Sequence, residues 1–179
     1  TDISEGAVLN SSTIRQTVTY VITPRITGSA VGADCSGSSV TVVMSIDPTP
    51  AVTSAGSDNI CSGSAVNYVP TGNVSGTVFN WTASNTVGTV SGFSAVGSGT
   101  ITDVLVNTTN VIGTVRYVIT PVANGCSGSA FNVDITVDPQ PVLSTTVTPV
   151  SQVVCDGDGY DIDVNSATVP SGVGTVVYD

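Results

Sequence analysis

The chain has 179 residues, with three arginines, no lysine or histidine and 13 acidic residues, so its formal net charge is −10. This charge repels phosphate backbones and anionic lipid surfaces, which excludes nucleic-acid binding. No apolar run reaches the length of about 18 residues that a membrane helix needs, so no membrane insertion is expected. Thr, Val, Ser and Gly dominate, and this composition is typical of exposed β-structure.

The sequence repeats itself. The segment VTYVITP at 18–24 returns as VRYVITP at 115–121. Each copy is followed by a cysteine, Cys35 or Cys126, and the spacing from that cysteine to the next Asp-Pro pair is identical in both copies. Self-similarity at a fixed period, here about 91 residues, indicates an array of one structural unit.

The repeat predicts three domains. We expect the C-terminal part of one repeat at 1–48, a complete repeat at 49–139 and the N-terminal part of the next repeat at 140–179. Because both ends fall within a unit, we expect the chain to be a stretch of a longer polypeptide.

Alternation of apolar and polar residues predicts the strands. In the first copy, Val18, Tyr20 and Ile22 share one face. The strands expected in the complete repeat lie at 51–56, 64–69, 76–83, 87–95, 101–107, 113–120 and 129–137. Seven short strands separated by Gly, Ser, Asn and Pro turns predict an all-β fold, an antiparallel β-sandwich of immunoglobulin type.

The same pattern predicts the core and the linkers. Trp81 lies where such sandwiches bury a central tryptophan, and Tyr117 lies where a tyrosine corner is found. Tyr20 is the counterpart of Tyr117 in the first copy. The alternating prolines of 47–50 and 138–141 favour an extended, semi-rigid backbone. We therefore expect the tandem sandwiches to be arranged as a rod.

A set of motifs accompanies this pattern: Cys-Ser-Gly at 61–63, Phe-Asn-Trp at 79–81, ITDVLVNTT at 101–109, VITP and a cysteine at 118–126, and a closing V-D-P-x-P. Together they resemble the PKD-like and Ig-like tandem repeats of very large surface proteins of gliding Bacteroidota. The resemblance implies export by the type IX secretion system and a role in cell adhesion, in some members as mobile adhesins of gliding motility. The chain departs from the usual W-x-F-G-D-G run, because Thr82-Ala83-Ser84 follows Trp81.

The cysteines are candidates for a covalent staple. Cys61 opens the second predicted strand and Cys126 precedes the last, so we expect a disulfide between them. Closing a loop of about 65 residues would contribute roughly 4 kcal/mol. Cys35 and Cys155 would then be unpaired within this sequence. The alternatives are bonds across the linkers (Cys35–Cys61 and Cys126–Cys155) and free thiols, and disulfides would indicate an extracellular location at the cell surface.

The densest acidic cluster follows Cys155. Its members are Asp156, Asp158, Asp161 and Asp163. Oxygen-rich loops can bind calcium, and Asp156, Asp158 and Asp161 are the candidate ligands. The equivalent stretch of the complete repeat, CSGSAVNYV, carries no acid, so a solvated acidic turn is the favoured interpretation. No other cofactor is expected.

Two further patterns bear on glycans. The N-x-S/T sequons begin at Asn10, Asn73, Asn80 and Asn107. In a chain this rich in Thr, Ser and Asn, composition alone explains them. The aromatic residues with candidate exposed rings are Tyr68, Phe93 and Tyr160. Three scattered rings do not predict a sugar-binding face.

The residues also argue against catalysis. With no histidine or lysine there is no base near neutral pH, and serines without a partner base are not nucleophiles. The leading hypothesis is a non-enzymatic repeat segment in the shaft of a large secreted bacterial adhesin, with neighbouring repeats as its partners. We also expect a glycan or protein target elsewhere in the chain and lateral self-association through edge strands. The alternatives are an accessory module of a secreted hydrolase, and a glycan- or protein-binding module.

Overall fold

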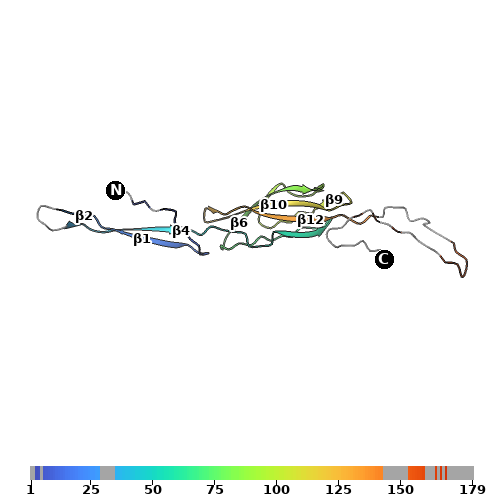
Figure 1. Ribbon diagram of the computed structural model, residues 1–179, viewed down its shortest axis with the longest axis horizontal. Helices are drawn as coiled ribbons and strands as arrows, with labels where there is room; N and C mark the ends of the chain where they lie inside the picture. The colour runs from blue at the N-terminus through green and yellow to red at the C-terminus, as the bar shows by residue number, and fades with distance from the viewer. Residues whose placement is uncertain are drawn as a thin grey trace.

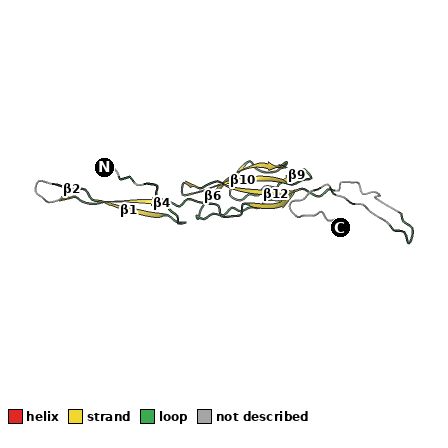
Figure 2. Ribbon diagram, in the orientation of Figure 1, coloured by secondary structure: helices red, strands yellow, loops and turns green. Residues whose placement is uncertain are grey.

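The structure is a computed structural model that describes residues 3–4, 6–28, 35–142, 153–159, 164, 166 and 168. Strands, turns and loops make up this part of the chain (Figure 2), and it contains no helix that could cross a membrane. The predicted all-β fold class is confirmed.

Eight strands build the unit within 49–139. They are β5 (Ser57–Cys61), β6 (Val78–Val87), β7 (Val90–Ser91), β8 (Val96–Ser98), β9 (Val106–Asn107), β10 (Gly113–Ala123), β11 (Cys126–Ser127) and β12 (Phe131–Asp138). The main sheet has the order β5-β12-β10-β6-β8, with β11 paired to β10, while β7 and β9 form a separate pair. Isolated bridges join Ala65 to Val104 and Tyr68 to Ile101. We call these bridged segments and the β7–β9 pair the opposing layer, because their buried residues pack against the main sheet.

Two predicted strands differ from the structure at the start of the unit. The segment 51–56 contributes one bridge, at Val52, and the strand begins only at Ser57. The sequence SDNIC has no alternating pattern, and only Ile60 packs against the core. It is a strand because its backbone pairs with β12, and this pairing is parallel rather than antiparallel. The segment 64–69 is held by bridges alone.

Two further boundaries follow from single residues. The predicted strand 87–95 breaks at Gly88, whose φ of 65° suits glycine in a turn between β6 and β7. Strand β10 continues past Pro121 to Ala123, because alternating burial persists along the whole strand and Pro121 pairs with Phe79 of β6.

The core lies between the main sheet and the opposing layer. Its fully buried side chains come from three segments: Val115, Tyr117 and Ile119 of β10, Val133, Ile135 and Val137 of β12, and Ile101 and Leu105 opposite them. The Trp81 and Tyr117 rings pack edge to face, with centroids 5.4 Å apart and planes at 77°. Burial of the inner face of the β10–β12 strand pair is the main stabilising interaction of the unit.

The first copy contains the same strand pair. β1 (Gln16–Ile22) and β4 (Val40–Ile46) pair antiparallel, and the short strands β2 (Arg25–Ile26) and β3 (Cys35–Ser36) extend their hairpin (Figure 1). Tyr20 lies opposite Val42, as Tyr117 lies opposite Val133 in the complete repeat. The two copies therefore share one strand register.

The linker between the copies is packed rather than exposed. Pro48 and Pro50 are fully buried. A side chain on Gly128 would lie 1.8 Å from the Pro50 carbonyl oxygen, so the linker lies directly against the chain that follows β11. At the start of the linker, the Arg15 guanidinium donates two hydrogen bonds of 2.8 Å to the Asp47 carboxylate.

Gly97 provides a test of the core. A Cβ at this position would come within 2.2 Å of the Trp81 ring. Gly97→Ala should therefore lower the free energy of unfolding by about 1–3 kcal/mol, the usual cost of overpacking. Chemical denaturation followed by the fluorescence of Trp81 measures it. Gly56→Ala is the matched control, since its new methyl would meet its neighbours at 3.4 Å. Equal stability of the two variants would contradict this packing.

Candidate functional site

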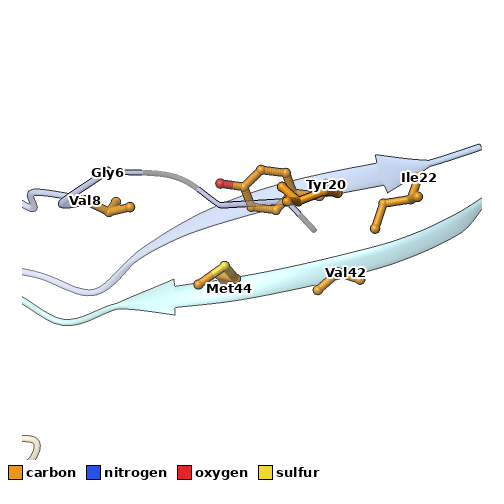
Figure 3. Close-up of a pocket in the computed structure, with 7 residues that line it drawn as sticks. Gly6, Val8, Tyr20, Ile22, Val42 and Met44 are labelled. Atoms are coloured by element: carbon orange, nitrogen blue, oxygen red, sulfur yellow. The ribbon is translucent and has the colours of Figure 1, made fainter. Parts of the chain in front are cut away.

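An apolar groove lies in the first copy, on the β1–β4 strand pair. Its volume is about 300 Å³. Its lining consists of Ile3, Gly6 and Val8 from the N-terminal segment with Tyr20, Ile22, Val42 and Met44 from the two strands. Figure 3 shows these strand side chains facing the segment that carries Val8. Taken alone, such a groove is a candidate site for an apolar ligand.

The complete repeat explains this groove differently. Val42 and Met44 are 42% and 49% exposed, whereas their repeat equivalents, Val133 and Ile135, are fully buried. Tyr20, which the sequence predicts to be core, is only half-buried, while its equivalent Tyr117 has no exposed surface. In the complete repeat, the opposing layer covers this face, and the Trp81 ring from the neighbouring strand β6 packs against Tyr117. The groove is therefore the core face of a sandwich rather than a ligand site.

An asparagine side chain fixes the end of the strand pair in both copies. Asn107 is 4% exposed. Its amide nitrogen donates to the carbonyl oxygens of Val111 (2.8 Å) and Val137 (3.0 Å). Its side-chain oxygen accepts hydrogen bonds from the backbone N–H and the hydroxyl of Thr109. We call this arrangement the asparagine staple.

The same staple is present in the first copy. Asn10 donates to the carbonyl oxygens of Ile14 (2.9 Å) and Ile46 (2.8 Å) and accepts from Ser12. In both copies one bonded carbonyl belongs to the residue directly before the Asp-Pro pair. The staple therefore fixes the point at which the linker leaves the sheet. Strand patterns do not predict this staple; its signal in the sequence is the matching position of the Asn10 and Asn107 sequons in the two copies.

Asn107→Asp tests the staple. The carboxylate replaces a donor with a charged acceptor that faces two carbonyl oxygens, so the loss of unfolding free energy at pH 7 should be about 2 kcal/mol or more. Burial raises the carboxyl pKa above its unfolded value of about 3.9. The protonated carboxyl can donate, so the deficit should shrink as the pH falls toward 4.

Denaturation of both proteins across this pH range measures the effect. Asn80→Asp is the control, because Asn80 is exposed on β6. It should change stability by no more than about 0.5 kcal/mol. A similar, pH-independent cost for both variants would contradict the staple.

A polar contact anchors Tyr117, which the sequence predicts to be a core residue. Tyr117 donates to the Asp103 carboxylate at 2.7 Å, and Asp103 also accepts from Ser94. The partner is a side chain, not the backbone that a tyrosine corner uses. Burial raises the pKa of Tyr117, so the phenol stays a neutral donor. Trp81 is 7% exposed.

The candidate sugar-binding rings do not form a platform. Tyr68 is buried, and its hydroxyl donates to the Ala55 carbonyl oxygen at 2.6 Å. Phe93 is half-buried against the core. Tyr160 lies outside the described residues. Tyr68 and Phe93 therefore pack within the unit and do not present a surface for sugar binding.

The structure contains no Cys61–Cys126 disulfide, and its four cysteines are unpaired. The strand register gives the reason. Cys61 lies beside Asp138, the last residue of β12, whereas Cys126 pairs with Ala123 beyond the opposite end of that strand. Eight residues of β12 separate these ends by more than about 20 Å, and a disulfide needs Cα atoms within about 7 Å. The alternative bonds across the linkers are absent as well.

The acidic cluster is described only in part. Asp156 and Asp158 are exposed in a turn in which the Asp158 N–H donates to the Cys155 carbonyl oxygen at 3.0 Å. Asp161 and Asp163 lie outside the described residues. Within the described part of the chain, no three Asp, Glu, His or Cys residues are close enough to hold a metal ion.

The outer face of the main sheet carries a cross-strand ion pair. Arg116 of β10 and Asp134 of β12 lie opposite each other, and two hydrogen bonds of 2.7 Å join them. The guanidinium lowers the pKa of the Asp134 carboxyl. Both side chains are more than a third exposed, so the ion pair contributes little to the free energy of unfolding. Its role is to favour the observed pairing register of β10 and β12.

The PKD-like domain family matches two stretches, residues 1–50 and 58–141. The chain belongs to this family. The two matches coincide with the two copies of the strand pair and its asparagine staple. No curated protein and no solved structure matches the chain. Membership in this family indicates a structural or binding module of extracellular proteins.

Proposed function

We propose that this PKD-like chain is a structural repeat segment in the shaft of a large, secreted bacterial cell-surface adhesin. Its role is geometric and non-enzymatic: the repeats hold an adhesive region away from the cell. Export by the type IX system and a part in gliding motility belong to the same proposal, on the resemblance to the surface proteins of gliding Bacteroidota. The adhesive target, a glycan or a protein, would bind elsewhere in the parent chain.

One observation carries the proposal: the linker is fixed at both of its ends. On one side, the asparagine staple binds the carbonyl of Ile46, and Arg15 binds Asp47. On the other side, Pro48 and Pro50 are buried and Pro50 lies against Gly128. A linker held in this way transmits the orientation of one repeat to the next, which is what a shaft requires and a flexible tether does not.

The surface chemistry supports a spacer more than an independent binding module. The apolar groove of the first copy corresponds to buried core, and Tyr68 and Phe93 are used for packing. The edge strands β5 and β8 carry few charges, so lateral association of shafts is part of the proposal.

The proposal predicts that length grows with repeat number. Residues 48–179 would be joined after Asp138, which adds one repeat at a natural Asp-Pro junction. The maximum dimension from small-angle X-ray scattering should rise by about 35 Å, the length of the 11 residues of β10 at roughly 3.3 Å each.

The control replaces Gly128 by Ala in both joined parts of the fusion, which displaces Pro50. This change should broaden the distribution of interatomic distances obtained from the scattering without unfolding the units. Gly56→Ala should leave the distribution unchanged. If the dimension does not rise, the repeats fold back on one another and the shaft role is wrong.

A further inference from the structure

The free thiol of Cys126 lies at the junction between the two copies. It follows the tight turn at Asn124 and Gly125, both with positive φ, that joins β10 to β11. Two residues later, Gly128 contacts the linker at Pro50. Figure 1 shows this turn at the end of the unit that faces the β1–β4 strand pair.

Cys126 is also close to the last strand of the preceding copy. The Asp47 carboxylate is the main cause that raises the pKa of Arg15, and a smaller contribution comes from the thiol of Cys126. Arg15 therefore contacts Asp47 directly and lies within electrostatic range of Cys126. Together with the contact of Gly128 with Pro50, this places Cys126 at the junction where Arg15 and Asp47 of the preceding copy lie.

Cys61 occupies the other end of its unit. It is exposed and lies opposite Asp138 in the parallel pair of β5 and β12. The backbone N–H of the next residue, Ser62, donates to the Asp138 carbonyl oxygen at 2.9 Å. Asp138 is the repeat equivalent of Asp47. The complete repeat therefore carries one cysteine beside its own C-terminal Asp and another at the junction with the repeat before it.

We propose that successive repeats are joined by a disulfide from Cys61 of one repeat to the equivalent of Cys126 in the following repeat. This inference rests on the proposed tandem shaft and on its oxidising surroundings. The two thiols lose two protons and two electrons, and a small-molecule disulfide that accepts them is reduced to two thiols. The linker and the disulfide would then join successive repeats at two points, and two attachment points resist bending between the repeats.

The test uses the fusion of residues 48–179 after Asp138, which contains a complete upstream repeat and a complete downstream repeat. Each part brings three cysteines: Cys35, Cys61 and Cys126 upstream, and Cys61, Cys126 and Cys155 downstream. After folding with glutathione disulfide, peptide mapping without reduction should find the upstream Cys61 bonded to the downstream Cys126. Thiol titration of the folded protein should count four free thiols, as it should for the original chain.

Matched variants identify the bond. Upstream Cys61→Ser and downstream Cys126→Ser should each abolish it, while upstream Cys126→Ser should leave it intact. A folded fusion with six free thiols, or with a bond between Cys61 and Cys126 of the same repeat, would overturn the proposal. Scattering from the same samples separates the two ideas: an elongated fusion without the bond contradicts only the disulfide, and a compact fusion contradicts the shaft.

Discussion

The structure depends on covering one apolar face, that of the strand pair β10 and β12. Six side chains of these strands are fully buried, which removes a large apolar surface from water. The cover comes from the opposing layer, including Ile101 and Leu105, and from the Trp81 ring of β6, the neighbouring strand in the sheet. Folding of a repeat is therefore non-local, and the strand pair alone, as in the first copy, leaves Val42 and Met44 exposed.

Two sets of polar contacts make this packing specific. The asparagine staple links the loop before β10 to the end of β12, and the Tyr117–Asp103 bond links β10 to the opposing layer. Buried polar groups that are fully paired specify one arrangement, because any shift would leave a donor or acceptor without a partner. The staple also fixes the start of the linker, so the same contact that completes the core determines where the next repeat begins.

The sequence predicted the features that depend on local pattern. Alternation along β10 and β12 gave the fold class, and the core position of Trp81 followed from its strand. Prediction from the sequence failed where a contact depends on segments that are far apart in the chain. β5 has no alternation and is a strand only because β12 lies beside it. Cys61 and Cys126 look adjacent in a strand diagram, but the parallel pairing of β5 places them at opposite ends. The burial of Pro48 and Pro50 depends on the neighbouring unit, which no local pattern records.

Hydrogen exchange tests the central claim, that the strand pair of the first copy is a sandwich half whose apolar face is meant to be covered. Residues 49–106 would be placed directly before Asn10, the repeat equivalent of Asn107, to supply the missing cover. The account predicts that amides of β1 and β4 become as protected as those of β10 and β12 in the same molecule. If their protection stays at the level of the original chain, the face is not a core face and the account is wrong.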